Sequence, residues 1–343
     1  MNYKVLSDIN LIDRKKWSEF TNEHPLGNAF QTPEMFDIYK SERNYEPVVV
    51  ICESNEGDYC GVLLSVIQRE YNGFIGKLSS RSIIWGAPLI HNNDEDILKL
   101  ILSEYDRIVT KKAVYTQIRN LWDTDNLRCV FEKMHYIFED HLNILVDLNK
   151  SEDALWSEIY SRRRSQINKS ERQGVTIRIF NDVKLIKESY DILLDVYRRA
   201  KLPLPSIEYF KAAEKFLGEK GYLKFFGAFY EEKLIGVMYL LCYNCITYEW
   251  YIGSFNDFMK KHPNDLIIWE IFKWGQKNKY KIFDFGGAGK PDKEYGVREY
   301  KKKFGGTIVN LGRYQKVHNK LLMSISVFGF RIWQLIKFGF KKQ

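Results

Sequence analysis

The stretch KIFDFGGAGKPDKEYGVREYKKKFGG, residues 281–306, decides the fold of this chain. It predicts a short buried strand over 281–285, a glycine-rich turn over 286–289, and a tight turn over 304–306 that leads into a last strand, 307–311. Lysines and aromatic residues are dense around these turns. The candidate chemistry is therefore concentrated in this part of the sequence.

Asp284 is the first candidate, because it is a carboxylate in an otherwise apolar strand. Such a group is costly unless it is hydrogen-bonded or paired, so Asp284 either caps the glycine turn or takes part in catalysis. The upstream strand over 246–252 alternates in a way that predicts Glu249 and Tyr251 on one face, with the Tyr251 hydroxyl near Glu249. That face can line a cleft.

The glycine turn does not match a nucleotide-binding loop. A Walker loop needs Ser or Thr after Lys290, where this chain has Pro291, and a dinucleotide fingerprint needs a following helix, where we expect more loop. Gly286 and Gly287 remain as part of a flexible turn whose N–H groups can hold an anion.

Two basic clusters are candidates for binding anions. One comprises Arg298, Lys301, Lys302 and Lys303, and the other comprises Arg162, Arg163, Arg164, Lys169 and Arg172 on one helix. Each is either a solvated face or a site for a diphosphate or an RNA backbone.

The elements outside this region repeat in a similar order in each half of the chain. The first half predicts a hairpin over 47–53 and 60–69, a loop around 83–88, a helix from 93 or 94 to 110, and strands over 114–118 and 142–148. The second predicts a helix from Ser151 to Gly174, a strand over 175–180, a helix to Ala200, another from Ser206, a hairpin over 222–230 and 233–242, and a helix over 264–278. We expect an α+β chain of two domains of similar build, 1–150 and 151–315.

The composition agrees with two ordinary domains. The chain has 343 residues, of which 45% are hydrophobic and 28% charged, which excludes a disordered chain, a collagen and a disulfide scaffold. Its net charge of +8 and aromatic content of 15% favour an anionic partner: a phosphate-bearing ligand, an RNA or a lipid surface.

The sequence contains no pattern typical of a metal site or a hydrolase. The Cys242/Cys245 pair lies in an apolar strand without a second Cys/His pair, so reduced core thiols are expected rather than zinc. The six histidines are isolated, and neither G-x-S-x-G nor H-E-x-x-H occurs. The start of the chain carries no apolar run, which favours a cytoplasmic protein.

Residues 316–343 form a basic tail. From Lys320 onward, apolar residues follow helical spacing with polar and basic residues opposite, and Arg331 interrupts any run of about 20 apolar residues that could span a bilayer. We expect an amphipathic helix that either lies in the membrane interface or packs on the body of the protein.

Three segments together resemble the Fem family, the peptidoglycan-bridge aminoacyltransferases, which are grouped with acetyltransferase-like proteins of polysaccharide synthesis. The stretch over 281–306, with Ile268-Trp269-Glu270 before it, resembles the family's C-terminal signature. The segment NAFQTP over 28–33 resembles its opening motif, and residues 163–175 resemble the helix that opens its second domain. The resemblance implies two tandem acetyltransferase-like (GNAT-type) domains and transfer of an activated acyl group to an amine without a metal.

The resemblance also assigns roles to residues. Lys40 and Arg199 match the basic residues that bind the cell-wall precursor, and Lys301 matches the lysine of the F-K-x-x-F-G motif, which serves the tRNA terminus or the transition state. Tyr300 replaces the phenylalanine of that motif. Asp284 or Glu249 would accept the proton of the attacking amine, and Lys301 with the loop N–H groups would stabilise the oxyanion.

We therefore expect an N-acyltransferase with no bound cofactor that moves an aminoacyl group from aminoacyl-tRNA to an amine of a peptidoglycan or surface-glycan precursor at the inner membrane face. The alternative is an acyl-CoA-dependent N-acetyltransferase that acts on a sugar or lipid amine. The Q/R-x-x-G-x-G/A turn with which acetyltransferases grip coenzyme A is missing before Asn264, which favours the RNA donor. A third hypothesis is a catalytically inactive scaffold that binds membrane glycolipids. We expect no DNA partner.

Overall fold

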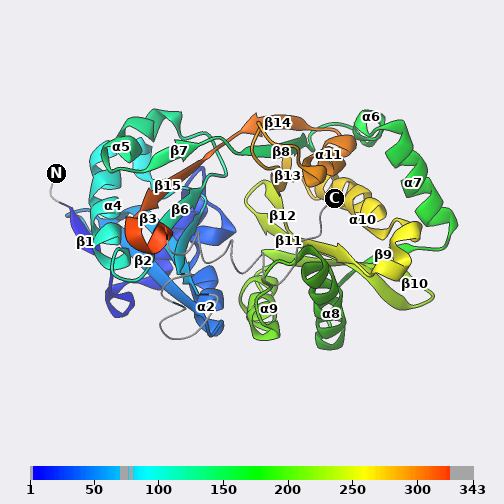
Figure 1. Ribbon diagram of the computed structural model, residues 1–343, viewed down its shortest axis with the longest axis horizontal. Coiled ribbons are helices and arrows are strands. Elements are labelled where there is room, and N and C mark those ends of the chain that lie inside the picture. The colour runs from blue at the N-terminus through cyan, green and yellow to red at the C-terminus, as the bar shows by residue number, and fades with distance from the viewer. Residues whose placement is uncertain (1–2, 70–75, 77–79, 325–343) are drawn as a thin grey trace. The chain divides into compact units, whose positions relative to one another are not determined.

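The computed structural model describes residues 3–69, 76 and 80–324, and the chain divides into two compact units (Figure 1). The first unit comprises residues 1–26, 30–139 and 312–343, and the second comprises 27–29 and 140–311. Each unit is built around its own mixed sheet, in which one pair of strands is parallel and the other pairs are antiparallel. The expected α+β architecture is confirmed.

The sheet of the first unit has the strand order β1-β2-β3-β4-β6-β15-β7, and β5 pairs with β3. Its strands are β1 (Lys4–Leu6), β2 (Tyr45–Glu53), β3 (Tyr59–Gln68), β4 (Arg81–Trp85), β5 (Leu89–Ile90), β6 (Tyr115–Arg119), β7 (Ile137–Glu139) and β15 (Arg313–Val317). Its α-helices are α1 (Arg14–Glu23), α2 (Pro33–Ser41), α4 (Glu95–Val109) and α5 (Arg128–Lys133), and its 3-10 turns are η1 (Ile9–Leu11), η2 (Ala29–Gln31), η3 (His91–Asn93) and η4 (Asp125–Leu127).

Strand β15 comes from the C-terminal part of the chain but lies between β6 and β7, which come from the first half. Its buried anchor is Tyr314, whose ring stacks on Phe131 at 4.3 Å and meets Phe138 at 5.3 Å. No strand is expected from the sequence after residue 311, because Tyr314 is the only large apolar side chain in the polar segment RYQKV.

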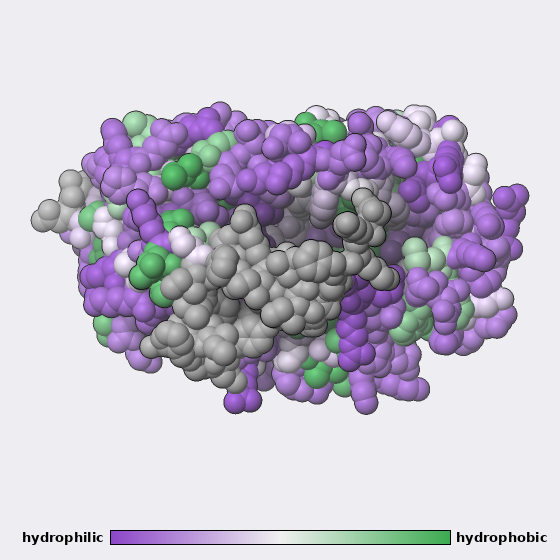
Figure 2. Space-filling view, in the orientation of Figure 1, coloured by the Kyte–Doolittle hydropathy of each residue, from purple (hydrophilic) through white to green (hydrophobic). Residues whose placement is uncertain are grey.

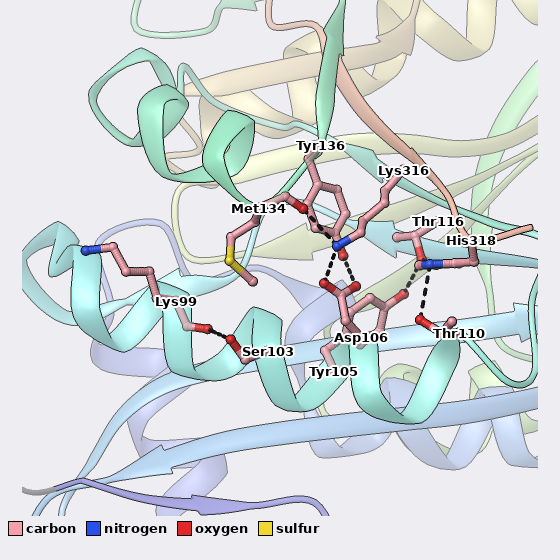
Figure 3. A network of polar contacts seen from close by, with 10 residues as sticks. All are labelled: Lys99, Ser103, Tyr105, Asp106, Thr110, Thr116, Met134, Tyr136, Lys316 and His318. Atoms are coloured by element: carbon pink, nitrogen blue, oxygen red, sulfur yellow. Dashed lines mark hydrogen bonds and ion pairs between the residues drawn. The ribbon is translucent and has the colours of Figure 1, made fainter.

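A network of polar contacts holds the end of β15 (Figure 3). Lys316 Nζ donates to Asp106 Oδ2 of α4 at 2.6 Å and to the Met134 carbonyl at 2.8 Å. The Tyr136 hydroxyl donates to the other oxygen of Asp106 at 2.7 Å. One carboxylate therefore fixes β15 against α4 and the start of β7.

The sheet of the second unit has the strand order β14-β8-β13-β12-β11-β10-β9. Its strands are β8 (Leu142–Asp147), β9 (Thr176–Phe180), β10 (Leu223–Tyr230), β11 (Lys233–Tyr243), β12 (Ile246–Ser254), β13 (Ile282–Gly287) and β14 (Thr307–Asn310). Its α-helices are α6 (Glu152–Glu158), α7 (Ser161–Arg172), α8 (Val183–Ala200), α9 (Ile207–Ala213), α10 (Pro263–Lys277) and α11 (Gly296–Lys301), with shorter turns η5 (Glu214–Gly218), η6 (Asn256–Lys261) and η7 (Lys302–Phe304).

Two expected features differ in the structure. The strand over 142–148, expected in the first domain, is β8 of the second sheet, so the chain changes unit between Glu139 and Asp140 rather than near residue 150. The helix expected from Ser151 to Gly174 is divided into α6 and α7 at Ile159–Tyr160. The break lets the Tyr160 N–H donate to the Lys303 carbonyl at 3.0 Å instead of continuing the helix.

The expected basic tail, 316–343, starts within strand β15, which includes Lys316 and Val317. Residues 320–324 form a helical turn, and the rest of the tail lies outside the described residues. Within the described ranges, we find no helix that combines the length and the hydrophobicity needed to cross a bilayer. The loop expected around 83–88 contains strand β4, which pairs in parallel with β6.

The contact of β15 with α4 predicts a large effect of Asp106→Ala. The substitution removes the carboxylate that pairs with the half-buried Lys316 ammonium and accepts from the Tyr136 hydroxyl, so the free energy of unfolding should fall by about 3–5 kcal/mol. Urea denaturation measures this change. Arg107→Ala is the control, because it removes an exposed ion pair with Glu104 from the same helix and should cost about 0–1 kcal/mol. Equal effects of the two substitutions would contradict the role of Asp106.

Candidate active site

The site is built where the parallel ladder between β12 and β13 ends. The two strands pair with each other from Ile246/Ile282 to Tyr248/Asp284, and both continue past that point without pairing with each other. Glu249 and Phe285 are the first residues beyond the ladder. Lys301, from the end of α11, contacts both: its Nζ lies 3.0 Å from Glu249 Oε1 and donates to the Phe285 carbonyl.

The Lys301–Glu249 pair is almost completely buried, with 9% and 7% of the two side chains exposed. Burial of either charge alone would cost several kcal/mol, so each stabilises the other in this position. An ammonium group has three N–H donors, and the described contacts of Lys301, to Glu249 and to the Phe285 carbonyl, use two of them.

Asp284 is buried beside this pair. It accepts the Gly286 N–H at 2.7 Å and the Asn143 side-chain amide at 3.3 and 3.4 Å. Burial raises the pKa of Asp284 to about 6, and the two hydrogen bonds and the positive charge of Lys301 oppose this rise. Asp284 is therefore ionised at neutral pH but takes up a proton only slightly below it.

The hydrogen bond from Gly286 shows that Asp284 caps the glycine turn, one of the two roles expected from the sequence. Gly286 has φ +69°, and a Cβ there would lie 2.9 Å from the Tyr248 hydroxyl oxygen. Only glycine fits this turn without strain.

Glu249 and Tyr251 do not share a face, contrary to the expectation from strand alternation. A β-bulge shifts the register so that Tyr239 pairs with Tyr251 and Leu240 pairs with Glu249. Glu249 therefore lies on the same face as Leu240, which belongs to the core under α10. Tyr251 points to the other face, where its ring packs on Phe210 at 5.0 Å. The extra residue of the bulge interrupts the period of two.

The glycine loop is held in place, which corrects the expectation of a flexible turn with free N–H groups. The Gly286 N–H is used by Asp284, and the Ala288 N–H donates to the Leu142 carbonyl at 2.6 Å. Arg298 donates to the Lys290 carbonyl at 2.7 Å and to the Lys293 carbonyl at 2.5 Å. Gly287 aligns with Asn143 in the ladder between β13 and β8.

Among the basic residues expected to bind substrate, Arg163 is already engaged. Its Nη1 lies 2.8 and 2.7 Å from the two oxygens of Asp265, and 12% of its side chain is exposed. Arg164 and Lys303 are half-buried, and none of the ion pairs described in this structure includes them. The Arg163 guanidinium is thus not open to a phosphate.

Lys40 and Arg199 lie in different units, Lys40 exposed at the end of α2 and Arg199 at the end of α8. Arg199 pairs with Asp195 at 3.1 Å and donates to the Ser254 carbonyl at the end of β12. Their common role in binding a precursor stays a prediction.

Asn143 and Asp265 were not among the candidates expected from the sequence. Arg298 was expected to bind an anion, whereas it donates to backbone carbonyls of the glycine loop. Asn143 carried the same signal as Asp284, a polar residue inside an apolar strand, but it lies 141 positions away and only the sheet brings the two together. Within the described ranges, no group of three His, Cys, Asp or Glu side chains is arranged to hold a metal ion.

Comparison with known proteins agrees with this fold. Residues 160–302 match the family model of the acetyltransferase (GNAT) domain, so the second unit contains an acyltransferase domain of this type. No curated protein matches the sequence significantly. The expectation of an acyltransferase enzyme with a GNAT fold is confirmed.

Solved structures match nearly the whole chain at low sequence identity. FemX superposes with a TM-score of 0.72 at 15% identity and covers 95% of this chain and 99% of its own. L-PGS from Bacillus licheniformis has a TM-score of 0.59 at 16% identity, with coverages of 93% and 96%. A tandem GNAT protein from the clavulanic acid biosynthesis pathway has a TM-score of 0.57 at 7% identity, with coverages of 93% and 99%. This chain therefore has the tandem GNAT fold.

The raised pKa of Asp284 predicts a pH-dependent effect of Asp284→Asn on stability. The wild-type carboxyl binds its proton more tightly when folded, so its stabilising contribution is complete below about pH 4 and is lost as the pH rises through about 6. The variant has no such loss. As the pH rises from 4 to 7, the stability of Asp284→Asn should therefore increase relative to that of the wild type, by about 2–3 kcal/mol in the free energy of unfolding.

Urea denaturation at pH 4 and pH 7 tests this expectation, with the exposed Asp292→Asn as the control that should show no pH-dependent difference. A constant difference between Asp284→Asn and wild type at the two pH values is the contrary outcome.

Proposed function

We propose that this acyltransferase moves an aminoacyl group from aminoacyl-tRNA to an amine of a peptidoglycan or surface-glycan precursor. The observation that carries the proposal is the buried cluster of Asp284, Glu249 and Lys301 at the end of the β12–β13 ladder. It combines a carboxylate poised to accept a proton with a fixed cation that has one donor to spare.

The chemistry of ester aminolysis needs both parts. The amine nitrogen attacks the ester carbonyl, a C–N bond forms, and the C–O bond to the tRNA ribose breaks. Asp284 accepts the proton that the amine loses, and the ribose oxygen takes up a proton as it leaves. The third donor of Lys301 stabilises the negative charge that develops on the carbonyl oxygen.

Unpaired cations on the second unit support an RNA donor. Arg162, Lys169 and Arg172 of α7 are exposed, and none of the described ion pairs includes them. The surface over α7, at the right of the view, is mostly hydrophilic in Figure 2. Lys302 and Lys303 follow Lys301 directly, and the Tyr160–Lys303 backbone hydrogen bond places them beside the start of α7. Such a surface suits a phosphate backbone.

The start of α10 argues against acyl-CoA as the donor. A helix N-terminus is a favourable place for a phosphate group. Here the buried carboxylate of Asp265 lies in the first turn of the helix and is neutralised by Arg163. An internal anion therefore takes the place that a pyrophosphate would need, in line with the absence of the coenzyme A turn before Asn264.

The direct test is transfer in a purified system. Incubation with a pool of aminoacyl-tRNAs and an amine-bearing lipid-linked peptidoglycan precursor should give the precursor a mass gain of one amino acid. Treatment with RNase should abolish the gain. A gain of an acetyl group from acetyl-CoA that is insensitive to RNase would instead support the acyl-CoA alternative, and no gain from either donor would overturn the proposal.

The cluster also predicts how the transfer rate depends on pH and on two side chains. The rate should rise with pH and level off above about pH 6, where Asp284 is ionised. Asp284→Asn should lose this pH dependence, and its rate should fall by a factor of about 10²–10⁴. The rate of Lys301→Ala should fall by a factor of about 10²–10³, because the oxyanion loses a hydrogen-bond donor. Lys277→Ala, at an exposed position at the end of α10, is the control for Lys301, and equal rates for the two variants would contradict the role of Lys301.

A further inference from the structure

A second buried carboxylate, Asp265, collects side chains from helices that are far apart in the sequence. It lies in the first turn of α10 and is 3% exposed. Arg163 of α7 donates to both of its oxygens, and the Tyr300 hydroxyl of α11 donates to Oδ1 at 2.7 Å. Asp265 is thus the point at which α7, α10 and α11 are joined.

Tyr300 is held at two places. The Arg163 guanidinium carbon lies 4.5 Å from the centre of the Tyr300 ring and 5.3 Å from that of Phe304. The ring is therefore covered by Arg163 while its hydroxyl is bound by Asp265. Burial and the negative charge of Asp265 raise the pKa of Tyr300 well above its usual value, so the hydroxyl keeps its proton and remains a donor.

Tyr300 directly precedes Lys301, and α11 is only six residues long. A helix this short gains little stability from its own hydrogen bonds, so tertiary contacts determine its orientation. Successive side chains of a helix point about 100° apart, which means that fixing Tyr300 also fixes the direction of Lys301. Phe304, four residues after Tyr300, packs on the Tyr300 ring at 5.4 Å and adds a second contact to this end of α11.

We infer that Asp265, with Arg163 and Tyr300, is the positioning group for Lys301: the carboxylate sets the direction in which the lysine enters the gap between β12 and β13. Asp265 acts through Tyr300 and does not itself contact the reacting atoms. The inference rests on the proposed function where it assigns Lys301 to the transfer reaction, but the placement of Lys301 is testable without any transfer.

The test is competitive acetylation of the full chain with acetic anhydride, followed by mass spectrometry of the peptide that contains Lys301. In the wild type, burial and the contact with Glu249 should protect Lys301 relative to the exposed Lys302. Tyr300→Phe keeps the ring under Arg163 but loses the bond to Asp265. Acetylation of Lys301 should then increase about tenfold, the factor expected for loss of one hydrogen bond to a charged group.

Tyr295→Phe is the matched control, because Tyr295 is 41% exposed at the start of the same helix, and its variant should label like the wild type. Asp265→Asn, which weakens the contacts of both partners, should increase labelling at least as much as Tyr300→Phe. The labelling is done at a temperature at which each variant is fully folded. If Lys301 stays protected in both variants there, Asp265 has only a structural role and the inference is overturned.

Activity separates this inference from the proposed function. If aminoacyl transfer occurs, Tyr300→Phe should lower kcat and leave KM for the acceptor unchanged, because the acceptor does not contact Asp265. If the wild type transfers nothing from any donor but the labelling of Lys301 still responds to Tyr300→Phe, the proposed function fails and the positioning role stands.

Discussion

The buried ion pair between Lys301 and Glu249 is the interaction on which the second unit depends. It lies where β12 and β13 stop pairing, and the Lys301 ammonium satisfies a carboxylate and a backbone carbonyl at that point. Without it, two polar groups of the sheet would be buried without partners. The same cation lowers the cost of ionising Asp284, so stability and candidate chemistry share one charge.

Other carboxylates, the half-buried Asp106 and the buried Asp265, also join distant parts of the chain. Asp106 joins β15 to α4 in the first unit, and Asp265 joins three helices in the second. In each case the partners are far apart in sequence, so the contact favours one arrangement of the chain over others. The raised pKa of Asp284 reflects its burial, which its hydrogen bonds and the charge of Lys301 offset only in part.

Much of the fold could be predicted from local patterns, because most strands and helices carry clear periodicity and caps. Strand β15 and the division into α6 and α7 could not. The only large apolar side chain of β15 is Tyr314, and the break at Tyr160 is stabilised by the Lys303 carbonyl, 143 residues later. Of the candidate site, Asp284, Lys301 and Glu249 are brought together as expected, whereas Tyr251 is directed to the opposite face by a bulge that alternation does not reveal.

The residues available for chemistry can be identified from the sequence: a carboxylate in an apolar strand, a glycine-rich turn directly after it, and a run of lysines next to aromatic residues. Which of these residues lie in contact follows only from the folded chain. Arg163 became an internal anchor rather than an open cation, and Asn143 became a partner of Asp284. The physical reason is that burial makes an unpaired charge or polar group expensive, and the partner that relieves this cost comes from a distant segment of the chain.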